Sequence, residues 1–170
     1  MNILVSACLV GQHCKYNGDH NLNEQVLDLA GQHNLIPVCP EQLGGLPTPR
    51  FCCELCDGRV KSEFGDDVTS QFEAGANRAL KTALENDVDL AILQPRSPSC
   101  GCGKVYDGTF SGELKEGDGV FTALLKKHDI PVIPVEKISS CIPFQNDIKF
   151  EQSKNIEEEN QNETDHCKDH

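Results

Sequence analysis

Short apolar runs and amphipathic stretches alternate along the first 138 residues of the chain. Four of the runs are rich in Val, Ile and Leu, as is typical of short strands buried in a parallel sheet. They span residues 3–7, 35–39, 89–93 and 131–135. In the segments between them, apolar positions recur at helical spacing. These helical patterns cover residues 22–31, 66–84 and 119–128.

This β-α-β-α-β-α-β alternation predicts an α/β protein with an open, mainly parallel four-stranded sheet and helices on both faces, Rossmann-like or flavodoxin-like. Residues 40–65 and 95–119 hold clusters of Pro, Gly, Ser and Cys, and they predict irregular loops. From Glu151 onward the chain carries seven acidic residues and one aliphatic residue. Such a segment buries too little apolar surface to fold. We therefore expect one domain at residues 1–138 and a disordered acidic tail at residues 139–170.

The charge balance is strongly acidic, with 15 Lys and Arg against 27 Asp and Glu and a formal net charge of −12. Binding a polyanion requires clustered basic residues, so we expect no bulk nucleic acid among the partners. The N-terminus has neither a basic segment nor a long apolar run, so neither a secretory signal nor a membrane span is expected. The chain is therefore predicted to be cytoplasmic, and its oligomeric state does not follow from the sequence.

Ten cysteines are an unusual number for 170 residues. Cytoplasmic thiols stay reduced, so cysteines at particular places indicate metal binding or catalysis. Cys8 and Cys39 end the first two predicted strands, and Cys100 lies in the loop just after the third. The carboxyl ends of parallel strands share one edge of the sheet, where ligands bind. Three converging thiolates could anchor an iron–sulfur cluster or a thiophilic metal, and three ligands would leave one iron open for substrate.

Polar residues accompany these three cysteines. Glu41 follows Cys39 by two positions, and Ser97 and Ser99 flank the proline just before Cys100. An acid and two hydroxyls beside three thiols are groups that a reaction would use, although serines next to proline are also ordinary turn residues.

The remaining cysteines are harder to interpret. A second metal site could draw on a group of loop cysteines, but a structural zinc site requires two pairs at defined spacing. The group consists of Cys52, Cys53, Cys56 and Cys102. Cys14 and Cys141 show no pattern.

Five motifs occur in a fixed order along residues 2–137. They are VSACLVG at 5–11, PVCPEQLGGLPTPR at 37–50, SPSCG at 97–101, YDGTFSG at 106–112 and GDGVFTALL at 117–125. Together they resemble the family of TudS-type thiouracil desulfidases. The resemblance implies a [4Fe-4S] cluster held by Cys8, Cys39 and Cys100 with one iron open. It also implies that Glu41 is the acidic catalytic group and that Ser97 assists it, with Ser99 as an addition from the same motif.

The reaction implied by this resemblance is the non-redox desulfuration of a small thiolated pyrimidine such as 2- or 4-thiouracil. The open iron would polarise the thiocarbonyl and capture the sulfide, Glu41 would activate water, and Ser97 would orient the reactants. Cys102 could compete with Cys100 as a ligand. Two alternatives stay open: another iron–sulfur lyase or hydratase, and a non-catalytic zinc or iron–sulfur protein. The sequence does not decide whether the substrate is a base, a nucleoside or a nucleotide.

Overall fold

A four-stranded parallel sheet forms the centre of the protein in a computed structural model that describes residues 1–142. Its strands are β1 (Asn2–Ser6), β2 (Asn34–Val38), β5 (Leu90–Leu93) and β8 (Val132–Pro134). The strand order is β2-β1-β5-β8, and every neighbouring pair is parallel. The predicted open α/β fold is therefore confirmed, and each predicted strand agrees with the observed one to within a residue at either end.

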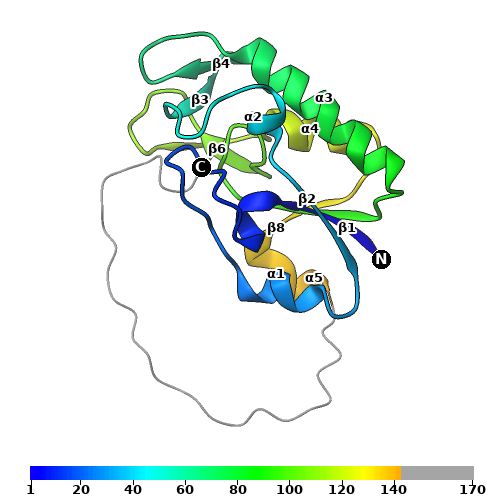
Figure 1. Cartoon of the computed structure of the whole chain (residues 1–170). Coiled ribbons are helices and arrows are strands. Elements are labelled where there is room, and N and C mark those ends of the chain that lie inside the picture. Colours follow the sequence, from blue (N-terminus) through cyan, green and yellow to red (C-terminus); the bar gives the residue numbers. More distant parts are fainter. Residues whose placement is uncertain (143–170) are drawn as a thin grey trace, which may run out of the picture.

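Helices cover both faces of this sheet (Figure 1). They are α1 (Glu24–Leu29), α3 (Thr69–Glu85), α4 (Val120–Lys127) and α5 (Ile138–Cys141). Successive side chains of a strand point to opposite faces, so the side chains of β1 pack in two separate core clusters. Leu4 packs in the cluster that contains Phe121 of α4, whereas Ile3 and Val5 pack in the cluster that contains Val26 of α1. The central strand β1 is thus buried on both sides.

The two segments predicted as irregular loops hold further regular structure, so that prediction was incomplete. They contain α2 (Pro40–Leu43), the hairpin β3 (Cys53–Cys56) and β4 (Arg59–Ser62), and the hairpin β6 (Lys104–Tyr106) and β7 (Leu114–Glu116). The turn of the first hairpin consists of Asp57 and Gly58, with φ of 49° and 76°. An Asp-Gly pair with positive φ at both positions matches the right-handed twist of the flanking strands.

Two short 3-10 helices extend strands of the sheet. They are η1 (Ala7–Val10) after β1 and η2 (Val135–Lys137) after β8. Beyond η2, Ile138 is fully buried and Ile142 is 4% exposed, and both pack in the core cluster on the α1 side. The packed structure therefore continues past residue 138, the predicted domain boundary. The predicted disordered tail lies, from residue 143 on, outside the described residues.

Helix α2 lies unusually close to the long helix α3. A Cβ atom added to Gly75 of α3 would lie 1.8 Å from the carbonyl oxygen of Pro40, and one added to Gly44 would lie 2.0 Å from that of Gln71. Both contacts involve backbone atoms, which cannot rotate away. Only glycine allows the two backbones to approach so closely at these points, and this approach fixes α2 relative to the sheet.

We expect Gly75→Ala to lower the free energy of unfolding by about 1–3 kcal/mol or more, because overpacking displaces α2 from α3. Alanine is otherwise the better helix former, so a gain in stability would contradict the packing argument. Asn77→Ala, at an exposed position of the same helix, is the control and should change stability by less than about 0.5 kcal/mol. Urea denaturation of the reduced protein measures both effects.

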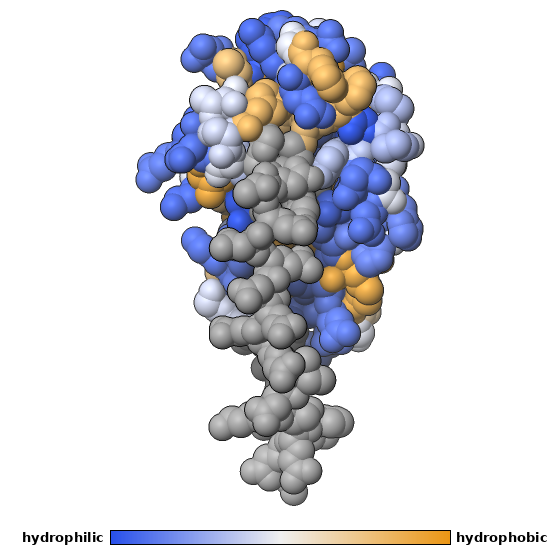
Figure 2. Space-filling view, turned by 90° about the vertical axis from the view of Figure 1, so that its left-hand side faces the viewer, coloured by the Kyte–Doolittle hydropathy of each residue, from blue (hydrophilic) through white to orange (hydrophobic). Residues whose placement is uncertain are grey.

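The surface on the side of the two hairpins is mostly hydrophilic, with hydrophobic residues in separate groups on the part not drawn in grey (Figure 2). Phe51 and Phe64 are 58% and 70% exposed, and their rings meet edge to face with centroids 4.7 Å apart. Each ring thus covers part of the other. Among residues 1–142, no helix has both the length and the apolar character needed to cross a bilayer.

Candidate active site

The three cysteines singled out in the sequence line one pocket at the carboxyl edge of the sheet. Cys8 lies in η1, directly after β1; Cys39 is the first residue after β2; and Cys100 lies in the loop that follows β5. Cys8 is 8% exposed and Cys100 is 5% exposed, while Cys39 is half-buried. The sheet topology therefore brings together thiols that are 31 and 61 residues apart in the sequence.

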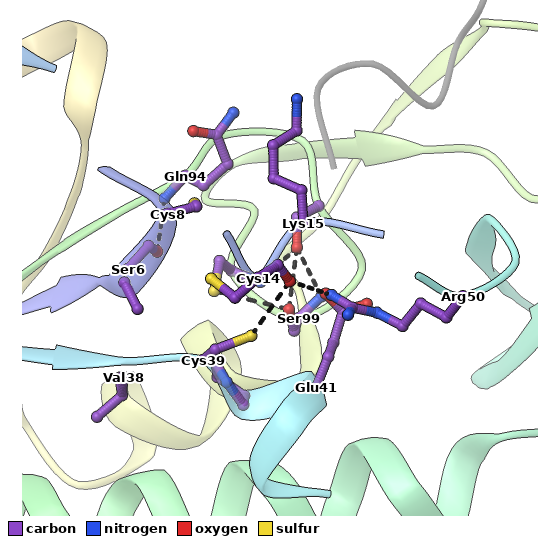
Figure 3. A pocket seen from close by; sticks show the side chains of 14 residues that line it. Ser6, Cys8, Cys14, Lys15, Val38, Cys39, Glu41, Arg50, Gln94 and Ser99 are labelled. Carbon is purple, nitrogen blue, oxygen red and sulfur yellow. Dashed lines mark hydrogen bonds and ion pairs between the residues drawn. The ribbon is translucent and has the colours of Figure 1, made fainter. Parts of the chain in front are cut away.

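A fourth thiol, that of Cys14, lines the same pocket and is missing from the predicted set. Cys14 is 3% exposed, and its thiol interacts with those of Cys8 and Cys39. Its carbonyl oxygen accepts hydrogen bonds from the Cys39 Sγ at 3.8 Å and from the Arg50 Nη2 at 2.8 Å, drawn as dashed lines in Figure 3. No spacing rule in the sequence indicates this position, since the loop after η1 is held by contacts to residues far along the chain.

The pocket raises the pKa values of three thiols, those of Cys14, Cys39 and Cys100. Burial raises the pKa of Cys100 to about 12, although the hydroxyls of Ser6 and Ser99 act in the opposite direction. The pKa of Cys39 lies far above its ordinary value, because the Cys14 thiol interacts with it and because it is buried. Cys39 in turn lowers the pKa of Cys14, but the Cys8 thiol and burial outweigh this and raise it to about 12. These thiols hold their protons at neutral pH, so a metal that binds them must displace protons.

An ion pair between Glu41 and Arg50 forms another wall of the pocket. Glu41 lies in the first turn of α2 and is 8% exposed. Its Oε2 accepts a hydrogen bond from Arg50 Nη2 at 3.0 Å, and the side chain of Arg50 is 5% exposed. Burial alone lowers the pKa of Arg50, but the attraction to Glu41 and to Cys39 more than offsets this and leaves the pKa above its ordinary value. The guanidinium thus fixes both the Glu41 carboxylate and the carbonyl of Cys14.

We expect Arg50→Met to lower the free energy of unfolding by about 3–5 kcal/mol, because it leaves the buried Glu41 carboxylate without its cation. The control is Arg59→Met, which breaks an ion pair with Asp67 of nearly the same length, 2.9 Å, between side chains that are 55% and 40% exposed. That substitution should lower the free energy of unfolding by about 1 kcal/mol or less. Urea denaturation of the reduced, metal-free variants measures both free energies of unfolding. Equal losses of stability in the two variants would contradict the argument that burial makes the pair of Arg50 the more important one.

Ser97 and Ser99 are both 2% exposed and lie beside Cys100 in the pocket. The Oγ of Ser97 accepts hydrogen bonds from the backbone N–H groups of Ser99 at 3.1 Å and Cys100 at 3.0 Å, and it lies 3.0 Å from the Oγ of Ser99. Ser99 donates from its own Oγ to the Cys100 Sγ at 3.6 Å. Ser97 therefore shapes the loop that presents Cys100, and Ser99 provides a hydroxyl donor to its sulfur.

The pocket also contains polar groups that the sequence analysis did not single out. Lys15, Arg50 and Gln94 line it, and the backbone N–H of Gln94 donates to the Oγ of Ser6 at 2.9 Å. Gln94 directly follows β5, so the position of strand ends could have indicated it. Lys15 and Arg50 lie in loops, and their spacing in the sequence does not indicate that they line the pocket.

The other loop cysteines of the described chain do not line this pocket. Cys53 and Cys56 belong to β3, and Cys52 precedes it. Cys53 is 6% exposed, donates to the carbonyl of Phe51 at 3.4 Å, and has a pKa raised to about 12 by burial. Cys102 donates to the carbonyl of Val132 at 3.8 Å and lines a different cavity. Of the two cysteines that precede β6, Cys100 is thus the one that lines the pocket.

Comparisons with known proteins agree on one family. Residues 3–137 match the family model described as 2-thiouracil desulfurase. The uncharacterized protein YbbK of Bacillus subtilis (strain 168) is 38% identical over 150 residues, which are 82% of this chain and 99% of that protein. A solved structure described as the [4Fe-4S]-dependent thiouracil desulfidase TudS matches with a TM-score of 0.78 and 39% identity, over 82% of this chain and 93% of that one.

Proposed function

The chain belongs to the 2-thiouracil desulfurase family and is a thiouracil desulfidase-like enzyme; from this premise we propose that it replaces sulfur by oxygen in small thiolated pyrimidines with the help of a [4Fe-4S] cluster. Cys8, Cys39 and Cys100 hold the cluster and leave one iron without a protein ligand. The observation that carries the proposal is the convergence of these three thiols with the buried carboxylate of Glu41 in one pocket.

The donor set of the pocket fits a cluster better than a single ion. Within residues 1–142, no three Cys, His, Asp or Glu side chains are grouped closely enough to ligate one metal ion. In a cluster the thiolates bind separate irons, so its ligands need not lie as close together as those of a single ion. Glu41 is already paired with Arg50, and the donors that remain are soft sulfur atoms, which select iron–sulfur clusters or thiophilic metals. The preference for a cluster over the mononuclear zinc alternative is supported by the similar solved structure, which is described as [4Fe-4S]-dependent.

The proposed reaction needs water and no electrons. When bound, the cluster supplies an iron that accepts the soft thiocarbonyl sulfur and acts as a Lewis acid. Glu41 takes a proton from water, whose oxygen forms a bond to the ring carbon while the carbon–sulfur bond breaks. Sulfur departs as sulfide and the pyrimidine keeps a carbonyl oxygen, so thiopyrimidine and water yield the oxo base and hydrogen sulfide. Neither carbon nor sulfur changes its oxidation state.

The serines and Arg50 prepare the site for this step. Arg50 holds the Glu41 carboxylate in one orientation through its 3.0 Å ion pair. Ser97 keeps the loop of Cys100 in place through two backbone hydrogen bonds, and the hydroxyls of Ser97 and Ser99 orient the substrate or the water from that loop. The walls leave these polar groups almost completely shielded from solvent, which strengthens each electrostatic interaction in the pocket.

The test is anaerobic reconstitution with iron and sulfide, followed by incubation with 2-thiouracil and with 4-thiouracil. We expect release of sulfide and formation of uracil in equal amounts, and neither product from the protein without its cluster. A full cluster that releases no sulfide from any thiolated pyrimidine would contradict the proposal and favour another iron–sulfur lyase or hydratase. Parallel assays with the corresponding thiolated nucleoside and nucleotide identify the substrate form.

A further inference from the structure

Gln94 is a buried residue of the pocket to which the proposed function gives no role. It is 8% exposed and directly follows β5, so it lies at the same edge of the sheet as the three cysteines. Among the described residues 1–142, it is the only one in the pocket lining whose side chain is a carboxamide. A carboxamide has a hydrogen-bond acceptor and a donor on neighbouring atoms. Gln94 can therefore pair with a ligand that presents a donor and an acceptor side by side.

The backbone of Gln94 is fixed by a hydrogen bond at the pocket. Its N–H donates to the Oγ of Ser6 at 2.9 Å, and Ser6, the last residue of β1, is 2% exposed. Gln94 also lines a second cavity, so it lies where the cysteine pocket adjoins a further space. Figure 3 shows its side chain well apart from the ion pair of Glu41 and Arg50. Gln94 and Glu41 can therefore act on different parts of one substrate.

The two thiouracils present the same edge to such an amide. In both isomers the N3–H lies between the thiocarbonyl and a carbonyl group, whose oxygen is O2 in 4-thiouracil and O4 in 2-thiouracil. The edge beside the thiocarbonyl thus carries a donor followed by an acceptor in either case. Glutamine and asparagine pair with a base edge of this kind through two parallel hydrogen bonds, as they do with adenine in DNA. One amide can therefore hold both isomers with the sulfur at the same place.

We propose that Gln94 is a specificity residue that pairs with the N3–H and the adjacent carbonyl of the thiopyrimidine. Its Oε1 accepts from N3–H, and its Nε2 donates to the carbonyl oxygen. This inference rests on the proposed function for the identity of the substrate. The pairing orients the thiocarbonyl of either isomer and involves only the N3 edge of the ring. A substituent on N3 therefore prevents it, whereas a substituent on N1 does not.

The experiment combines a change in the protein with a change in the ligand. Reconstituted wild type and Gln94→Leu are assayed anaerobically with 4-thiouracil and with its 3-methyl and 1-methyl derivatives. In the wild type, the 3-methyl group should lower kcat/KM about ten- to a hundredfold, the scale of one bidentate pair, and the 1-methyl group by less than about threefold. Gln94→Leu should show the same loss with 4-thiouracil, mainly as a higher KM, because the pairing binds the ring before and during the reaction alike. It should show no further loss with the 3-methyl derivative.

The control is Gln32→Leu, the same change at an exposed position just before β2, at the opposite edge of the sheet. It should leave every value unchanged. If Gln94→Leu lowers kcat/KM by the same factor for all three substrates, Gln94 has a structural role only and the proposal is wrong. Equal turnover of 4-thiouracil and its 3-methyl derivative by the wild type would overturn it as well. If Gln94→Leu assembles no cluster, the wild-type ratio between the two methyl derivatives decides alone.

Binding of uracil separates this inference from the proposed reaction. Uracil presents the same N3–H and carbonyl edge but has no sulfur to lose, so calorimetry measures its affinity without turnover. Even in a protein that releases no sulfide from any thiolated pyrimidine, uracil should bind the wild type about ten- to a hundredfold more tightly than it binds Gln94→Leu. That result would support the pairing while contradicting the reaction. Equal affinities, or no binding of uracil to the wild type, would overturn the pairing.

Discussion

Cys8→Ser, Cys39→Ser and Cys100→Ser are each expected to abolish assembly of the [4Fe-4S] cluster and with it all release of sulfide from thiouracil. Each substitution replaces a soft thiolate by a hydroxyl, which is a poor ligand for iron in a cluster. The effect should be close to complete, because the three cysteines come from three different strand ends and each supplies one of the three proposed ligands. The visible absorbance of the reconstituted protein and its iron and sulfide content measure the loss.

Cys53→Ser and Cys102→Ser are the controls for this prediction. Both cysteines lie outside the pocket, with Cys53 in β3 and Cys102 near Val132 of β8. Both variants should assemble the cluster with wild-type iron content. A lost cluster in Cys102→Ser together with a normal one in Cys100→Ser would mean that the ligand of this loop was misidentified.

The strand pattern of the sequence was sufficient to place three thiols in one pocket. In a parallel sheet the direction of the chain fixes which end of each strand lies at which edge. Once the apolar runs of β1, β2 and β5 were identified, the residues that follow them had to gather at one edge. Glu41 lies near Cys39 because only Cys39 separates the end of β2 from the start of α2, so the position of Glu41 also follows from the local sequence.

Cys14 and Arg50 could not be predicted in the same way. Cys14 follows no strand, and its place depends on a hydrogen bond from Arg50, 36 residues away. Arg50 in turn lies in the stretch predicted as loop, between α2 and β3. Such long-range contacts between two irregular segments leave no periodic pattern. The hairpin of β3 and β4 was missed for a different reason, since its Asp-Gly turn was visible but its strands contain charged residues and cysteines in place of alternating apolar ones.

Glu41→Gln is expected to leave the cluster intact and to lower turnover by about a hundred- to ten-thousandfold, the usual range for a group that transfers a proton. Glutamine has nearly the same shape, and its amide oxygen can still accept the hydrogen bond that Arg50 donates at 3.0 Å. The pocket should therefore keep its geometry. What is lost is the ability to take a proton from water. Steady-state release of sulfide from thiouracil, with absorbance and iron content measured on the same sample, separates the two effects.

Glu54→Gln is the matched control, because Glu54 is also a buried carboxylate, 1% exposed, but lies in β3 and does not line the pocket. Its Oε1 accepts hydrogen bonds from the backbone N–H groups of Gly108 and Phe110, both at 3.1 Å, so its role is to join the two hairpins. Glu54→Gln should reduce stability and leave turnover per cluster unchanged. Turnover at the wild-type rate in Glu41→Gln would assign proton transfer to another group. Loss of the cluster in that variant would instead mean that the carboxylate is needed to form the pocket, because only the charge of residue 41 has changed.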